Sequence, residues 1–239
     1  MKDNEFYDLW NGIQILGEII DTVSEGINEF TSENRQALYE LRNYLEHHSE
    51  INAQIWQKAA EFGWFPNDFI SMEFVIHTEN GQECLDEYMS HAIENVVNHI
   101  HNQLVDMYPA RKAIIDVAFN LHKEGNYIAA IPLFLSQTDG ICAQSIGSYL
   151  FSGNKQRMEK IKQLIISDPH KAIILAPLKQ ETQFGARIAN AKTAHKAKAP
   201  NRNGILHGSR QHLDYATKIN SLKCISLLAY VSTIFVDEK

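Results

Sequence analysis

Hydrophobic residues recur at steps of three and four positions along most of the chain. The first such run contains Phe6, Leu9, Trp10, Ile13, Leu16, Ile20 and Val23. Further runs of the same kind cover 38–45, 51–59, 82–106, 111–124, 127–150, 155–166, 172–188 and 220–235. This spacing places apolar side chains on one face of a helix, and no window alternates as a half-buried strand does. The pattern predicts an all-α protein.

Glycine and proline divide these predicted helices. An aromatic corner at 62–66 (FGWFP) interrupts one helix and starts a new direction, and Tyr108-Pro109 marks another break, because a residue before proline resists the helical conformation. Pro132 and Gly140 predict kinks inside the helix over 127–150, and Pro177 starts or interrupts the helix over 172–188. The polar stretch 192–200 predicts a loop.

The composition indicates a folded protein without a membrane span. The chain has 239 residues, of which 44% are hydrophobic and 21% are charged, which excludes disordered and collagen-like chains. Its longest apolar stretch, 224–236, is shorter than the roughly 20 residues that cross a bilayer. Acidic residues replace the basic start of a signal peptide, and three scattered cysteines fit a reducing compartment. We expect a soluble cytoplasmic protein.

Charge is distributed unevenly between the two halves of the chain. Residues 1–108 contain four bases and 20 acids, a net charge of −16, whereas residues 109–239 contain 18 bases and nine acids, a net charge of +9. We therefore predict two parts, an acidic helical module at 1–108 and a second domain at 109–239. The basic region can bind RNA or DNA, it can be a solvated lysine face, or the acidic half can dock on it and mask it.

A polar stripe follows the predicted helix over 82–106. It consists of Glu83, Glu87, His91, Glu94, Asn98 and His101. Such a stripe can bind a metal in a helix bundle, but here it lies opposite the apolar face. We therefore interpret it as a solvated face and expect no metal and no cofactor. Catalytic triads and phosphate-binding glycine loops are absent from the sequence.

One short pattern, Arg-Asn-x-x-x-His, carries residues that could cleave RNA without a metal. An imidazole can transfer a proton to or from the ribose 2′-oxygen or the leaving 5′-oxygen, and a guanidinium can stabilise the charged phosphoryl group. The pattern occurs at Arg42–His47 and at Arg202–His207. The first copy lies in the acidic half, within a predicted amphipathic helix, and we interpret it as a chance match.

The second copy, Arg202–His207, lies in the basic half before the last apolar helix. In a regular helix, five residues rotate His207 by about 140° from Arg202. Both side chains can therefore serve one reaction only if the helix begins irregularly or if a second subunit completes the site.

The sequence around this motif resembles the C-terminal part of HEPN domains (higher eukaryotes and prokaryotes nucleotide-binding). The similar run starts at Asn201 and includes an Asp-Tyr-x-Thr-x-x-Asn-Ser-Leu-Lys segment, matched by Asp214, Tyr215, Thr217, Asn220, Ser221, Leu222 and Lys223. The segment from Tyr127 to Asp139-Gly140 resembles the acidic helix of a toxin-like and abortive-infection branch of this family. The resemblance covers about 110–239, and residues 1–108 resemble no family.

The resemblance implies a HEPN-like helical bundle at 109–239 that forms a homodimer, with paired motifs in one cleft. Many members of the family are metal-independent endoribonucleases of toxin–antitoxin, abortive-infection or CRISPR defence systems. Arg202 and His207 would be catalytic, Asn203 would support them, and Asp139 would orient or tune the basic pair. Ser209 replaces a tyrosine that another toxin branch modifies, so we expect no regulation there.

The remaining candidates for RNA binding are Tyr215, Lys223, Arg210 and Lys218. Asp139 can instead cap or end a helix, and Tyr215 can instead fix a turn. Asn220 is placed as the N-cap of the last helix, and Lys223 would lie in its first turn, where the helix dipole disfavours a cation. For His212 the sequence predicts only a position in a loop.

The leading hypothesis is a dimeric endoribonuclease that acts on RNA and has an antitoxin or another defence-system protein as a partner. A non-catalytic nucleotide- or RNA-binding adaptor and a protein-interaction dimer are the alternatives. The presence of both Arg202 and His207 favours the enzyme.

Overall fold

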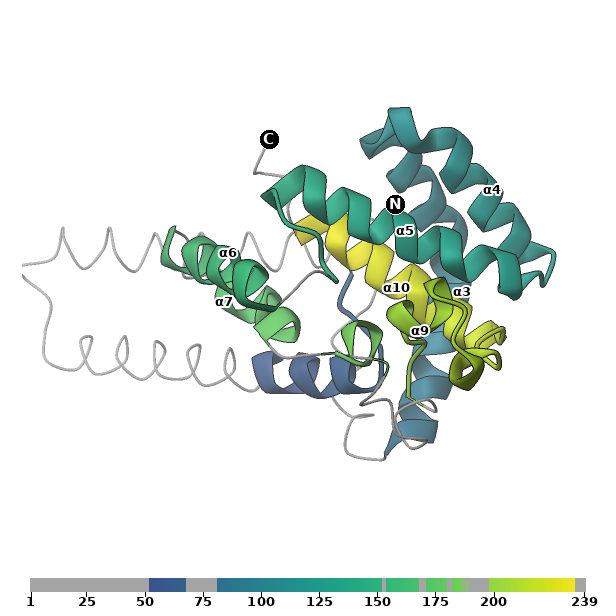
Figure 1. Cartoon of the computed structure of the whole chain (residues 1–239), viewed down its shortest axis with the longest axis horizontal. Coiled ribbons are helices and arrows are strands. Elements are labelled where there is room, and N and C mark those ends of the chain that lie inside the picture. The colour runs from purple at the N-terminus through teal and green to yellow at the C-terminus, as the bar shows by residue number, and fades with distance from the viewer. Residues whose placement is uncertain are drawn as a thin grey trace, which may run out of the picture. The chain divides into compact units, whose positions relative to one another are not determined.

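The computed structural model in Figure 1 describes residues 52–67, 81–151, 154–167, 171–179, 182–186, 188 and 198–234. Within these ranges the chain forms helices, turns and loops, and no strand occurs among them, which confirms the predicted all-α fold. The helices predicted over 6–23 and 38–45, and the Arg42–His47 copy of the motif, lie outside the described residues.

The described helices follow the predicted order. Residues 52–61 are helical. The longer helices are α3 (Gln82–Met107), α4 (Lys112–Lys123), α5 (Tyr127–Ile146), α6 (Asn154–Ser167) and α10 (Lys218–Ile234). The shorter ones are α7 (Lys171–Ile174) and α9 (Arg202–Leu206), with 3-10 turns η2 (Pro109–Arg111), η3 (Ala176–Lys179), η4 (Gln183–Gly185) and η6 (Arg210–His212).

Two of the predicted helices have different bounds in the structure. The continuous helix predicted over 172–188 is wrong, because α7 ends at Ile174 and the helical residues that follow within this range, among those described, have 3-10 geometry. Pro177 lies inside η3, where its missing N–H cannot continue an α-helix. Helix α5 ends at Ile146 rather than near 150, because Gly147 adopts a left-handed backbone with φ of 67°.

Helix α10 is the centre of the core. Every residue from Ser221 to Ser232 is buried, so this helix is enclosed on all sides rather than on one face. It packs against α5 and α3, and α4 in turn packs against both of these helices. Figure 1 shows α5 and α10 running side by side. The apolar run that the sequence marks as its longest is therefore the core helix of the fold.

The aromatic corner at 62–66 packs directly against α10. Trp64 and Phe65 are fully buried, and the ring of Phe65 stacks on that of Tyr230 at 5.3 Å between centroids. The hydroxyl of Ser226 accepts a hydrogen bond from the Phe65 N–H at 3.0 Å and donates one to the Phe65 carbonyl at 3.1 Å. This serine therefore satisfies both backbone groups of a segment that belongs to no helix.

A compact unit extends over Ala53–Lys239. The boundary predicted after residue 108 falls inside it, between α3 and α4, so the structure places α3 with the C-terminal residues. Buried residues of α3, including Leu85, Met89 and Ile93, form one cluster with those of α5 and α10. The uneven charge suggested the boundary, whereas the packing of α3 with the C-terminal helices depends on its apolar face.

Two further observations concern the membrane and redox expectations. Among the helices that the structure describes, none combines the length and the apolarity needed to span a bilayer. All three cysteines are free thiols, with Cys142 and Cys224 buried and Cys84 partly exposed. Burial, and next to it the charge of Asp139, raises the pKa of Cys142 to about 12, so this thiol stays protonated.

Candidate functional site

The Arg-Asn-x-x-x-His motif forms the short helix α9. Asn201 caps its start, since the side-chain oxygen of Asn201 accepts a hydrogen bond from the Gly204 N–H at 2.6 Å. Gly204 packs so tightly on His212 that a Cβ atom there would lie 2.1 Å from the imidazole Cδ2. After His207, Gly208 takes a left-handed conformation with φ of 63° and ends the helix. Local interactions therefore fix both ends of α9.

Arg202 and Asp139, two predicted site residues that are 63 positions apart, form an ion pair. The Nη2 atom of Arg202 lies 3.1 Å from Oδ2 of Asp139, and the two side chains are 25% and 9% exposed, respectively. The other carboxylate oxygen of Asp139 accepts a hydrogen bond from the Phe151 N–H at 3.1 Å. The guanidinium carbon of Arg202 also lies 5.6 Å from the centre of the Phe151 ring. Tertiary packing thus brings α5 and α9 together at one charged pair.

Asp139 does not cap or end its helix. Helix α5 continues through Gly140 to Ile146, so Asp139 lies within it and its carboxylate is used in tertiary contacts. Gly140 leaves room for Arg111, because a Cβ atom at this position would lie 2.9 Å from the Arg111 Nη1 atom. In the Asp139-Gly140 pair, the aspartate forms an ion pair and the glycine allows Arg111 to pack closely.

Asn203 and Asn201 tie α9 to the segment 182–186. The amide nitrogen of Asn201 donates to the carbonyls of Gln183 at 3.1 Å and Ala186 at 2.8 Å. The amide nitrogen of Asn203 lies within 3.4 Å of the carbonyls of Gly185 and Ala186, and its oxygen accepts from Arg202 Nη1 at 3.2 Å. Asn203 therefore contacts Arg202 and also anchors the helix.

His207 lies apart from this cluster. It is the C-cap of α9, its side chain is exposed, and its backbone N–H bonds to the Asn203 carbonyl at 3.1 Å. Because α9 begins as a capped, regular helix at Arg202, an irregular start does not bring the two motif ends together. Within one copy of the chain, Arg202 faces Asp139 and His207 faces solvent.

The predicted RNA-binding residues Tyr215, Arg210 and Lys218 have different surroundings. Arg210 is exposed in η6. The hydroxyl of Tyr215 donates to the Ile128 carbonyl at 2.8 Å, and burial raises its pKa, so this group anchors a turn to α5. Lys218 is 56% exposed and pairs with Glu94 at 2.5 Å, and this hydrogen bond raises the pKa of the lysine. Of these three residues, Arg210 has the most accessible charge.

Lys223 is buried in the core, which corrects its assignment to an RNA-binding surface. Only 1% of its side chain is exposed, and its ammonium lies 2.8 Å from Asp86 Oδ1 and 5.3 Å from the centre of the Trp64 ring. It also donates to the Lys198 carbonyl. Burial lowers the pKa of Lys223, and the charge of Asp86 opposes this effect. Helix α10 begins at Lys218, so Lys223 lies beyond the first turn.

The predicted cap of the last helix is also at a different residue. The hydroxyl of Thr217 accepts a hydrogen bond from the Asn220 N–H at 3.2 Å, which is the geometry of an N-cap. The amide nitrogen of Asn220 donates instead to the Tyr215 carbonyl at 2.9 Å. Thr217 therefore caps α10, and Asn220 stabilises the turn before it.

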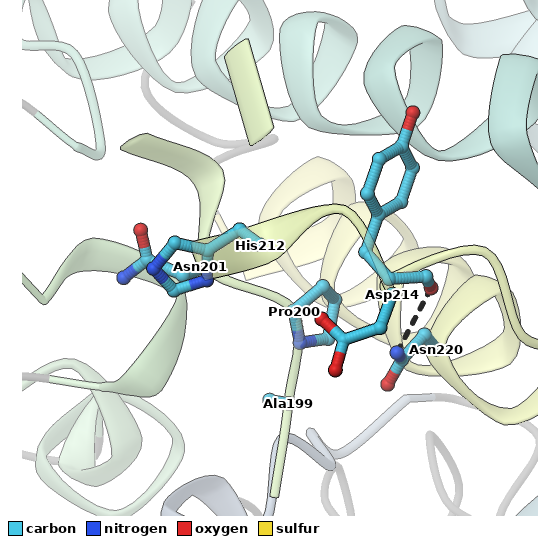
Figure 2. Close-up of a pocket in the computed structure, with 7 residues that line it drawn as sticks. Ala199, Pro200, Asn201, His212, Asp214 and Asn220 are labelled. Atoms are coloured by element: carbon cyan, nitrogen blue, oxygen red, sulfur yellow. Dashed lines mark hydrogen bonds between the residues drawn. The ribbon is translucent and has the colours of Figure 1, made fainter. Parts of the chain in front are cut away.

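A small polar hollow opens beside α9. It is lined by Ala199, Pro200, Asn201, His212, Asp214, Tyr215 and Asn220. Figure 2 shows the carboxylate of Asp214 beside Pro200 and Asn220, with His212 and Asn201 on the other side. The hollow combines segments on both sides of the motif, because Asn201 precedes α9 and Asp214 follows η6.

The polar stripe of α3 is only partly a solvated face. His101 Nε2 lies 2.8 Å from Asp116 Oδ1 in α4, and the imidazole stacks on the Phe119 ring at 4.6 Å. Hydrogen bonds from Lys112 and then His101 lower the pKa of Asp116. Three or more metal-binding side chains do not gather anywhere in the part of the chain that the structure describes. The stripe therefore contributes to packing between α3 and α4.

Sequence reasoning missed three residues of this region: Asn201, Phe151 and His212. Asn201 immediately precedes the motif, and an asparagine there is the usual N-cap signal. Phe151 has no local signal, because its contact with Arg202 depends on the fold. His212 is 5% exposed and packs on Gly204, so it belongs to the support of α9 rather than to a loop.

Comparisons of the chain with protein-family models, with curated proteins and with solved structures found no match. The resemblance to HEPN domains therefore depends on the sequence motifs alone. The contacts around α9 are independent of it.

Proposed function

We propose that the protein is a metal-independent endoribonuclease whose site is built on α9 and completed in a homodimer. Arg202 would stabilise the phosphoryl group, His207 would transfer protons, and Asn203 and Asp139 would position Arg202. An antitoxin or another defence-system protein is the corresponding regulatory partner.

The observation that carries this proposal is the Arg202–Asp139 ion pair. The side chain of Arg202 is only 25% exposed, and that of its partner Asp139 is more buried still, so the fold holds this charged pair in a fixed place. The Asp139 pair and the Asn203 contact together use two of the five N–H groups of the arginine. The partial exposure leaves room for an anionic oxygen to approach the guanidinium. The arrangement fits an arginine held in position for a phosphate.

The chemistry requires a base, an acid and a cation. The ribose 2′-oxygen attacks phosphorus and loses its proton to one imidazole, while the leaving 5′-oxygen takes a proton from another. The products are a 2′,3′-cyclic phosphate and a 5′-hydroxyl end. A guanidinium stabilises the negative charge that develops on the phosphoryl oxygens. One copy of the chain offers one exposed histidine in the motif, so His207 of the partner subunit would supply the second proton transfer.

Exposed apolar side chains near the motif support the dimer. Leu206 and Leu213 are 41% and 65% exposed, and they flank the segment that contains His207 and Arg210. Ile128, whose carbonyl accepts the Tyr215 hydroxyl, is 58% exposed. A patch formed by such side chains would be typical of a contact with another protein. A second copy packed here would bring two copies of His207 close together.

Cleavage of single-stranded RNA by the full-length protein tests this function. His207→Ala should lower the rate about 10²- to 10⁴-fold, because it removes one positioned acid or base. The histidine is exposed, so its removal should leave thermal unfolding nearly unchanged. The wild-type reaction should continue in EDTA and should leave a cyclic phosphate. The matched control is His47→Ala in the other copy of the motif, which should cleave like the wild type.

Different outcomes separate the candidate functions. Wild-type-like cleavage by His207→Ala, or inhibition by EDTA, contradicts the proposal. A monomer in sedimentation that still cleaves RNA contradicts the composite site. The adaptor alternative is favoured by the separation of Arg202 and His207 within one copy, and it is supported if the wild type binds RNA through Arg202 and never cleaves it.

A further inference from the structure

The hollow beside α9 contains two hydrogen-bond acceptors that the fold does not use. Asp214 is exposed and has no hydrogen-bond or ion-pair partner among the described residues. The amide nitrogen of Asn220 is engaged with the Tyr215 carbonyl, so its oxygen is the group left for a ligand. By contrast, the oxygen and the nitrogen of Asn201 are both used in the cap and the anchor of α9.

Two unused acceptors favour a ligand that donates hydrogen bonds along one edge. An ionised carboxylate only accepts, and its two oxygens can take two parallel N–H groups. Among the bases of RNA, guanine alone presents two adjacent donors, N1–H and the N2 amino group, on its Watson–Crick edge. Adenine, cytosine and uracil each place an acceptor next to their donor, and that acceptor would face the carboxylate unfavourably.

The position of the hollow connects it with the motif. Asn201, in its wall, is the N-cap of α9, and His207 is the C-cap. The six residue steps between these two caps correspond to about 9 Å along a helix axis. This separation is comparable with the length of one nucleotide from base edge to phosphate. The hollow has a volume of about 30 Å³, which is too small to enclose a purine ring, so only the edge of a base would enter it.

We propose that this hollow is a base-binding subsite in which the Asp214 carboxylate accepts the Watson–Crick edge of a guanine in the RNA. Asn220 offers a further acceptor to the N2 amino group. The subsite deepens the proposed function, because it names the base next to the cleaved phosphate, and it rests on that function for its role in cleavage. Binding of guanine itself does not depend on cleavage.

The test measures binding of 3′-GMP and 3′-AMP to the full-length protein by calorimetry. We expect 3′-GMP to bind at least about tenfold more tightly than 3′-AMP, because a bidentate contact with a base edge usually discriminates between bases by this much. Asp214→Asn should remove this preference, because an amide places a donor against a donor. Glu159→Gln is the matched control, since it removes an exposed carboxylate on α6 and should keep the preference.

A second measurement follows cleavage of RNA oligomers with a single guanine or a single adenine. Asp214→Asn should lower the ratio of cleavage at guanine to cleavage at adenine about tenfold. Equal affinities for the two nucleotides, or a preference that survives in Asp214→Asn, overturn the subsite. If the tripeptide Gly-Arg-Gly binds in an Asp214-dependent way and 3′-GMP does not, the hollow recognises a protein side chain and the inference is wrong.

The two proposals fail separately. Cleavage of RNA without a guanine preference retains the ribonuclease and removes the subsite. Asp214-dependent binding of 3′-GMP without any cleavage retains the subsite and removes the ribonuclease.

Discussion

The ion pair between Arg202 and Asp139 is the contact on which the proposed site depends, and a double-mutant cycle measures it. Asp139→Asn is the informative first change. The asparagine has nearly the same shape, and its Oδ1 can still accept the Phe151 N–H, but its amide nitrogen would face the donor Nη2 of Arg202. The substitution therefore removes the charge with little change in packing.

The expected magnitude follows from distance and burial. Charges centred on atoms 3.1 Å apart attract by about 5 kcal/mol at an effective dielectric constant of ~20, and desolvation of both groups offsets much of this. Asp139 is 9% exposed and Arg202 is 25% exposed, so the pair is more costly to break than a surface ion pair. We expect Asp139→Asn to destabilise the protein by about 2–3 kcal/mol, and Arg202→Met by a similar amount.

The double variant should lose less than the sum of the single variants. Once the arginine is gone, the aspartate has no counter-charge, so neutralising it relieves a penalty. We expect a coupling energy of about 1–3 kcal/mol, measured by urea unfolding of the full-length chain at neutral pH. A coupling energy below about 0.5 kcal/mol would refute the reasoning, since independent sites add to within that margin. The ion pair would then not position Arg202.

Three other predictions concern the support of the fold. Lys223→Met should destabilise the protein by about 3 kcal/mol in urea unfolding, because the partly buried carboxylate of Asp86 keeps its hydrogen bonds from Trp64 and Gln82 but loses its counter-charge. Lys218→Ala on the exposed ion pair should barely change the midpoint. Gly204→Ala should destabilise the protein by more than about 2 kcal/mol in thermal unfolding, because its methyl group would overlap the buried imidazole of His212. Gly208→Ala should cost only about 1 kcal/mol, because the space there is open and only the left-handed backbone is strained. Burial lowers the pKa of His122 below its ordinary value of 6.5. The unfolded chain therefore binds more protons than the folded protein below pH 6.5, and the free energy of unfolding should fall as the pH drops below this value. The dependence of this free energy on pH should be weaker in His122→Gln.

Much of the fold could be predicted because helical periodicity is local. The apolar steps in 82–106 and 111–124 are visible within one window, and α3 and α4 follow them within a residue or two. The helix predicted over 172–188 is wrong for an equally local reason, because a proline inside that window outweighed its apolar residues. Asn201 and Gly208 flank the Arg202–His207 motif and fix the ends of α9, although the capping role of Asn201 was missed in the sequence.

The candidate site was harder to predict, because its contacts join distant residues. Asp139 and Arg202 were both singled out from the sequence, and the resemblance implied that the acid would orient or tune the basic pair, but their local sequences alone do not reveal the contact. Lys223 shows most clearly what the sequence could not predict. In the sequence it is a basic residue in a basic region, yet in the fold it lies in the core beside Asp86.

The sequence by itself determined the helical class, the main helices and the motif at α9, because each depends on residues within a few turns of one another. Only the tertiary structure decided which charged side chains are exposed. Helix α10 is apolar on nearly every side, so its pattern does not say which neighbours will enclose it, and α3 and α5 settle that question by packing. A buried charge is stable only where a partner meets it, and such a partner can come from anywhere in the chain.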